Sequence, residues 1–86
     1  MDNACCKGCG VKLTTDNNHC MLDVGSGPQS IHEICFHEYT ISGYCGECLR
    51  SIIDTVMSTA TRYTDVDDRN RHLIDVFEQY GDKVNR

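Results

Sequence analysis

Seven cysteines in a chain of 86 residues are the side chains best suited to chemistry in this sequence. Four of them form two Cys-x-x-Cys pairs, Cys6–Cys9 and Cys45–Cys48. Each pair places two thiolates close enough to bind one metal ion, and two pairs complete the tetrahedral Cys₄ shell of a structural zinc site. The spacing therefore predicts one structural zinc ion held by Cys6, Cys9, Cys45 and Cys48.

Two other interpretations of the pairs, a redox dithiol and unmetallated core cysteines, are less well supported. Cys45 and Cys48 could lie at a helix N-terminus, where the helix dipole lowers the pKa of a thiol. The first pair would then have no role, and the βαβ context of a dithiol oxidoreductase is missing. Cys5 adjoins Cys6 and could compete with it as a ligand, although the Cys-x-x-Cys-Gly form favours Cys6.

The residues that follow the two pairs predict the elements that hold them. Gly10 follows Cys9, which is typical of a tight knuckle whose turn needs a residue free to adopt a positive φ. After Cys48, apolar residues recur with the spacing of one helical face. This stripe consists of Leu49, Ile52, Ile53, Val56, Met57, Ala60 and Tyr63.

A hairpin is expected between the two pairs. Residues 19–24 and 31–40 predict two strands, with an open loop at 25–30. If Cys20 lies opposite Phe36, one face of this hairpin is apolar. The other face then carries three side chains that could bind a second metal ion: His19, Cys35 and His37. In the alternative that we favour, Cys35 is a small buried hydrophobic residue and the two histidines are solvated.

A knuckle, a hairpin and a helix that starts at the second pair resemble the treble-clef class of zinc fingers. The resemblance covers about residues 5–60 and concerns a fold group, so it implies a metal site more strongly than a function. Nucleases of the His-Me type also resemble this chain in having two such pairs around a hairpin. They would need metal ligands from the helix, which residues 46–63 do not supply.

Beyond the first helix, acidic residues at 65–68 and a second apolar stripe predict a C-terminal helix that ends near Gly81. The expected fold is a small α+β zinc-bound domain in which the two helices pack as an antiparallel hairpin. We expect a single domain over residues 1–86. Its parts are the zinc-binding knuckle, hairpin and helix at 5–63, the C-terminal helix at 64–81, and a frayed tail at 82–86.

Composition restricts the function and the compartment. The net charge of −5 disfavours binding to phosphate backbones, which needs a basic face. No charged segment followed by an apolar stretch opens the sequence, so no signal peptide is expected, and the apolar runs are too short to span a membrane. A reducing cytoplasm therefore fits, with zinc in place of disulfides.

Catalytic motifs fail on their spacing. His32 and His37 are five residues apart, whereas the His-Glu-x-x-His motif of zinc proteases needs four. Four thiolates also leave no open coordination position for water. The chain is therefore predicted not to be an enzyme.

Binding to another protein is the function predicted from these features. Small size, acidity and the lack of a catalytic set also resemble phage-encoded proteins that inhibit or adapt host machinery, which would place the chain in the host cytoplasm. The leading alternative is a nucleic-acid-binding zinc finger or transcription regulator. The side chains expected to bind a partner lie on the helices, with Tyr80 as an aromatic anchor: Arg62, Arg69, Arg71, Asp75, Glu78 and Tyr80.

Overall fold

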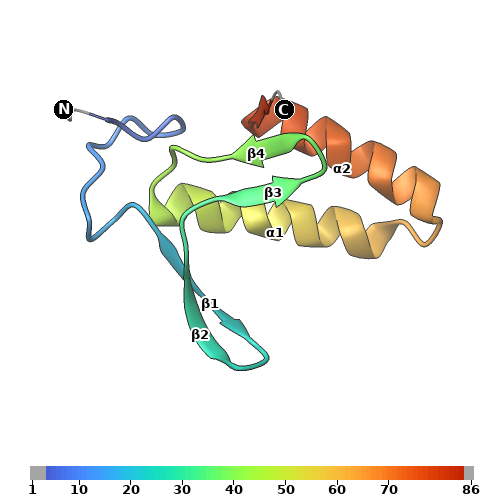
Figure 1. The fold of residues 1–86 in the computed structure, drawn as a ribbon, viewed down its shortest axis with the longest axis horizontal. Coiled ribbons are helices and arrows are strands. Elements are labelled where there is room, and N and C mark those ends of the chain that lie inside the picture. Colours follow the sequence, from blue (N-terminus) through green and yellow to red (C-terminus); the bar gives the residue numbers. More distant parts are fainter. Residues whose placement is uncertain (1–3, 85–86) are drawn as a thin grey trace.

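The computed structural model describes residues 4–84 and shows a small α+β fold. Four strands precede two helices, and a fifth strand follows them (Figure 1). In chain order the elements are β1 (Cys20–Val24), β2 (Gly27–Ile31), β3 (Ile34–Phe36), β4 (Tyr39–Ile41), α1 (Gly46–Arg62), α2 (Val66–Tyr80) and β5 (Asp82–Lys83). Neither helix is long and apolar enough to cross a membrane, as judged over residues 4–84.

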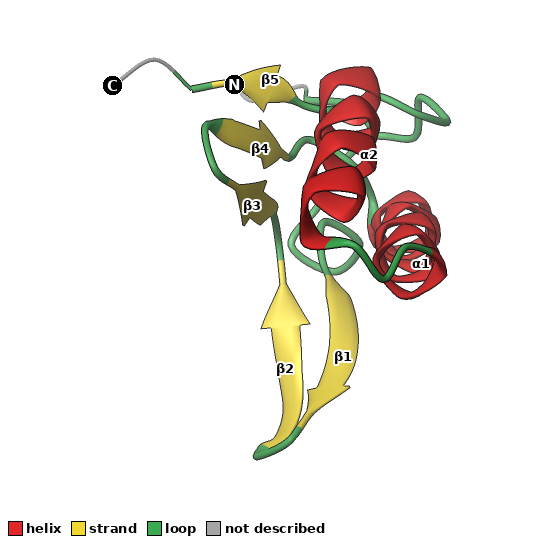
Figure 2. Cartoon of the chain, turned by 90° about the vertical axis from the view of Figure 1, so that its right-hand side faces the viewer, coloured by secondary structure: helices red, strands yellow, loops and turns green. Residues whose placement is uncertain are grey.

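The strands form two separate antiparallel sheets. The β1–β2 hairpin extends away from the rest of the molecule, and its base contacts α1 (Figures 1 and 2). The second sheet has the order β3-β4-β5 and packs against α2. The helix α2 folds back over α1, so the predicted helical hairpin is present (Figure 2).

The predicted pairing of the hairpin is wrong. Cys20 pairs with Ile31 instead of Phe36, and the stretch at 25–30 that was expected to be an open loop supplies most of β2. The single strand predicted for 31–40 is instead two short strands, β3 and β4, with a turn between them. His37 lies in this turn with a φ of 55°, a left-handed conformation in which histidine is enriched relative to most residues.

The C-terminal tail also differs from the expectation. Asp82 and Lys83 pair with Thr40 and Tyr39, and they add β5 to the edge of the second sheet. The Val84 N–H donates to the Glu38 carbonyl. Residues 82–84 are therefore ordered by backbone pairing, while residues 85–86 of the predicted tail lie outside the described range.

The helices form where the apolar stripes predict them. Leu49, Ile52 and Ile53 are buried on α1, and Leu73 and Phe77 are buried on α2. The three buried residues of α1 and Phe77 of α2 form one core with Ile41 of β4 and two of the paired cysteines, Cys6 and Cys45. Burying these apolar side chains contributes more to stability than helix propensity does in elements of this length.

The start of α2 follows from its acidic residues. Asp65 is the N-cap, and its side chain accepts a hydrogen bond from the Asp67 N–H at 2.9 Å. Asp67 and Asp68 lie in the first turn, where negative charge interacts favourably with the helix dipole. The helix ends at Tyr80, and the following Gly81 N–H donates to the Phe77 carbonyl at 2.7 Å.

Candidate metal centre

Four cysteine sulfurs meet at the N-terminus of α1. The Sγ atoms of Cys6, Cys9, Cys45 and Cys48 all lie within 4.8 Å of one another, and Cys9 Sγ is 3.8 Å from Cys45 Sγ. A tetrahedral zinc site with Zn–S bonds of about 2.3 Å also places its sulfurs about 3.8 Å apart. These four cysteines could therefore hold a metal ion, and their geometry fits zinc. Cys6, and not the adjacent Cys5, belongs to the cluster.

The first pair lies in a tight loop closed by backbone hydrogen bonds. The Cys6 N–H donates to the Val11 carbonyl at 2.7 Å, and the Gly10 N–H donates to the Cys6 carbonyl at 3.0 Å. The N–H groups of Gly8 and Cys9 point at Cys6 Sγ, at 3.3 and 3.5 Å. Gly10 has a φ of 83°, so the expected need for a positive φ after the first pair is confirmed.

The second pair is positioned by the start of α1. Cys45 is the N-cap residue, and Cys48 lies in the first turn. The Gly46 N–H donates to the Asn17 carbonyl at 2.7 Å, which brings the loop before β1 onto the helix start. A Cβ at Gly46 would collide with the backbone carbonyl of His19. Glycine between the two cysteines is therefore required for this close approach.

The thiols of the cluster differ in acidity. Burial acts to raise the pKa of Cys6, but hydrogen bonds from the backbone of Cys45, Cys9 and Gly8 lower it to about 6. The hydrogen bond with Cys6, together with burial, raises the pKa of Cys48 to about 12. The Val11 backbone acts to lower the pKa of Cys9, yet the Cys6 hydrogen bond and burial raise it overall. Without a metal, the thiolate form of Cys6 is therefore stabilised. Its negative charge disfavours ionisation of the neighbouring Cys9 and Cys48 thiols.

We expect zinc binding at pH 7 to release at least two protons per ion, because Cys9 and Cys48 hold their protons until the metal displaces them. Thiols of the unfolded chain, with pKa values of about 8.5, are also protonated at pH 7. Lower pH favours the protonated thiols and therefore weakens zinc binding. If two protons are released, the zinc affinity falls about a hundredfold for each unit by which the pH is lowered. Titration calorimetry in two buffers of different ionisation enthalpy measures this number. Release of less than one proton would contradict the assignment of these thiols as ligands.

The structure does not assemble the second metal site considered from the sequence. His19 precedes β1, Cys35 lies in β3, and His37 lies in the β3–β4 turn. Within residues 4–84, no group of three or more potential ligand side chains other than the four cysteines is close enough to hold a metal ion. Cys35 is also exposed, with its Sγ 3.6 Å from the Thr40 hydroxyl, so the expectation of a buried Cys35 is wrong. His19 instead lies against His32, with ring centroids 5.5 Å apart.

We therefore expect the His37→Ala variant to bind one zinc ion per chain, the same number that we expect for the unmodified protein. Its stability should change by only about 0.5 kcal/mol, as for other exposed residues, because the His37 side chain is exposed and its ring contact is with the adjacent Phe36. Native mass spectrometry and thermal unfolding check both values. If the unmodified protein binds two zinc ions and the His37→Ala variant binds one, the second metal site exists.

The predicted partner-binding residues on the helices fall into different environments. Tyr80 is half-buried and packs against the core, so it is not an exposed aromatic anchor. Glu78 accepts a hydrogen bond from the Tyr39 hydroxyl at 2.9 Å. Arg62 and Asp75 line a shallow groove of about 230 Å³. Of the remaining two, Arg71 is exposed and Arg69 is half-buried.

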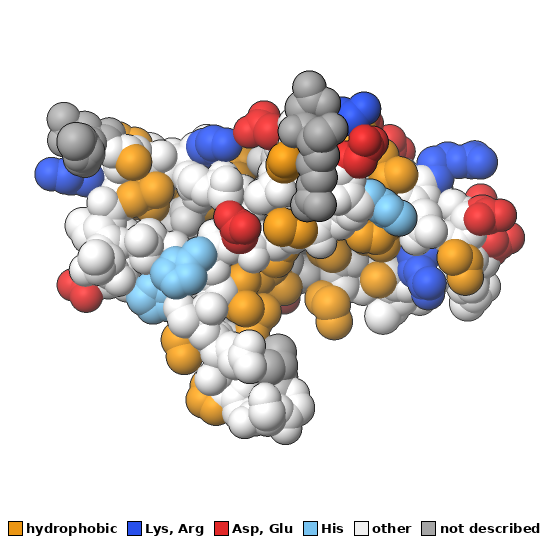
Figure 3. Space-filling view, viewed as in Figure 1, with side chains coloured by type: hydrophobic (Ala, Val, Ile, Leu, Met, Phe, Trp, Pro, Cys, Tyr) orange, Lys and Arg blue, Asp and Glu red, His pale blue; other side chains and the backbone are white. Residues whose placement is uncertain are grey.

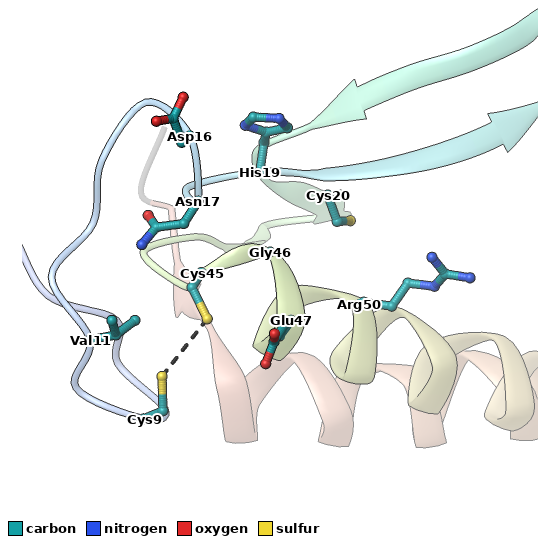
Figure 4. Close-up of a pocket in the computed structure, with 10 residues that line it drawn as sticks. All are labelled: Cys9, Val11, Asp16, Asn17, His19, Cys20, Cys45, Gly46, Glu47 and Arg50. Atoms are coloured by element: carbon teal, nitrogen blue, oxygen red, sulfur yellow. Dashed lines mark hydrogen bonds between the residues drawn. The ribbon is translucent and has the colours of Figure 1, made fainter.

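An open cavity of about 670 Å³ borders the cysteine cluster. It lies between the loop that precedes β1 and the first turns of α1 (Figure 4). Its lining includes Cys9, Asp16, Asn17, His19, Glu47 and Arg50. The sequence did not indicate this cavity, because its two walls are far apart in the chain and only the packing of the loop on the helix start creates it.

Comparison of the chain with protein-family models, with curated proteins and with solved structures gave no match. By its fold and its site, the chain is a small α+β domain with a four-cysteine cluster suited to a metal ion.

Proposed function

We propose that this chain is a zinc-binding protein in which the metal stabilises a treble-clef-like fold and the function is to bind another protein. The closed shell of four cysteine sulfurs carries the proposal. Four thiolates complete the coordination of zinc, so no position remains for a substrate or a reactive water. The metal then links the N-terminal loop to the start of α1, and it acts on the fold and not on a substrate.

The surface supports a role in protein binding. Met21 in β1 and Met57 in α1 are 50% and 60% exposed. Figure 3 shows hydrophobic side chains gathered where the hairpin meets the helical body. Flexible, exposed methionines are frequent at protein-binding surfaces, and exposed apolar patches mark interaction sites more often than chance. An inhibitor or adaptor of another protein's machinery would use such a surface.

Binding to nucleic acid is the second candidate function, because zinc-stabilised domains commonly bind nucleic acid and three arginines lie in or beside α2. The chain has 8 Lys and Arg against 13 Asp and Glu. Since nucleic-acid binding depends on contacts between cationic side chains and phosphates, this balance favours a protein partner.

The salt dependence of binding separates the two candidates. The zinc-loaded chain should retain a protein from cell extract through a high-salt wash, because apolar contacts resist screening. It should bind duplex DNA no tighter than about 10 μM at physiological salt, which is the level of non-specific binding. The variant Arg69→Ala/Arg71→Ala removes the two arginines of α2 that would contact phosphates. If the unmodified chain binds DNA or RNA tightly and in a salt-sensitive way, and this variant does not, nucleic-acid binding becomes the favoured function.

A further inference from the structure

We propose that the cavity beside the cysteine cluster is a docking site for a lysine- or arginine-bearing segment of the partner protein. This inference rests on the proposed function and specifies the chemistry of the partner. The cavity is concave and borders the metal centre, and its floor combines the sulfurs of Cys9 and Cys45 with the side chain of Val11 (Figure 4).

The charges around the cavity favour a cation. Asp16 contributes a carboxylate from the loop before β1, and Glu47 contributes a second from the first turn of α1. Within residues 4–84 neither carboxylate forms an ion pair, because the described ion pairs join Lys7 to Asp82 and Lys83 to Glu38. Both groups are therefore available to an external partner.

The metal centre adds to this negative potential. With zinc bound, the four thiolate ligands would give the centre a net charge of about −2, which belongs in any account of the local field. Cys9 and Cys45 belong to both the cluster and the cavity lining. Arg50 is the one guanidinium in the lining, and it is outweighed by the two carboxylates and the metal centre. A phosphate or carboxylate ligand would be repelled by the same charges.

The shape of the site also suits a long cationic side chain. Lysine and arginine have apolar stems and charged ends, and they bury the stem against apolar surface while the charge reaches polar groups. Here Val11 and Cys20 provide apolar lining, while Asp16 lies on the loop before β1 and Glu47 on the first turn of α1 (Figure 4). A long cationic side chain can therefore place its stem against the apolar lining and its charged end near a carboxylate.

Peptide selection tests the proposal directly, since it needs only the zinc-loaded protein and no named partner. The protein is used to select from a yeast-displayed library of short random peptides, alongside the variant Asp16→Asn/Glu47→Gln. The control variant Asp23→Asn/Asp54→Asn removes the same charge from exposed positions on β1 and α1 outside the cavity. Zinc stoichiometry and circular dichroism establish that each protein is folded. If the double variant loses zinc, the two single variants provide the same comparison.

We expect the unmodified protein and the control variant to enrich lysine and arginine, and the cavity variant to lose this enrichment. A selected peptide should bind the cavity variant about tenfold more weakly, the effect of losing two partly exposed ion pairs. Equal enrichment by the cavity variant, or no enrichment by the unmodified protein, would overturn the proposal. Selection of peptides rich in aspartate, glutamate or phosphate mimics would overturn it as well.

Protein capture distinguishes this inference from the proposed function. If the unmodified chain and the cavity variant retain the same partner from extract equally well, the protein-binding function stands and the cationic docking site is wrong. If cationic peptides are selected but no partner is retained from any extract, the docking site stands and the protein-binding function is contradicted.

Discussion

Replacing Cys6 by serine should abolish zinc binding and unfold the chain. Cys6 is buried, its sulfur accepts hydrogen bonds from two backbone N–H groups, and it belongs to the four-sulfur cluster. In small zinc domains the metal-binding free energy is largely folding free energy, on the order of 10 kcal/mol. A loss of this size exceeds the stability that a chain of this length derives from its core alone. Circular dichroism should show loss of the helical signal, and mass spectrometry should show loss of the metal.

The variant Cys35→Ser is the matched control, since it makes the same chemical change at an exposed cysteine outside the cluster. It should keep both the zinc ion and the helical signal. The account fails if Cys6→Ser retains the native spectrum and thermal transition, or if Cys35→Ser loses the metal.

Leu49→Ala should have the second largest effect. The Leu49 side chain is 0% exposed and lies in α1 one residue after Cys48, so it connects the metal centre to the hydrophobic core. Removing a buried leucine side chain in this way costs about 2–5 kcal/mol, because transfer free energy is lost and a cavity remains. Denaturant unfolding at saturating zinc measures this cost as a change in the free energy of unfolding.

Met57→Ala provides the comparison within the same helix. Met57 follows the same apolar spacing in the sequence but is 60% exposed, so its truncation should change stability by no more than about 0.5 kcal/mol. Similar costs for Leu49→Ala and Met57→Ala would show that the core does not lie where the structure places it.

The four clustered cysteines and α1 could be predicted because their signals are local. The two Cys-x-x-Cys pairs specify ligands by spacing alone, and Leu49, Ile52 and Ile53 mark one helical face. Gly10 likewise revealed its positive φ through its position after Cys9. Each of these inferences depends on residues that are close together in the chain, and none depends on the pairing of distant segments.

The hairpin was mispredicted because its second strand has no strand-like pattern. Pro28, Gln29 and Ser30 in β2 are exposed and lack the alternation of a half-buried strand, so turn propensity dominated the prediction. Residues 31–40 have a strand-like composition but do not form one continuous strand. They are rich in β-branched and aromatic residues, but His37 and Glu38 form a turn, and only the pairing of β3 with β4 reveals it.

Features formed by distant segments could not be predicted from either segment alone. β5 forms because Asp82 and Lys83 pair with the edge of β4. Two exposed polar residues have no sequence pattern that predicts a strand. The cavity has the same origin, since Asp16 and Glu47 line it together only after the loop before β1 packs on the start of α1.

Native mass spectrometry of the whole chain, before and after treatment with a strong chelator, tests the central claim most directly. The account predicts one zinc ion per chain in a compact, low-charge-state species, and a shift to highly charged, unfolded species when the metal is removed. A compact species that carries no metal, or one that keeps its charge-state distribution after chelation, would contradict the claim that a four-cysteine zinc centre holds this fold together.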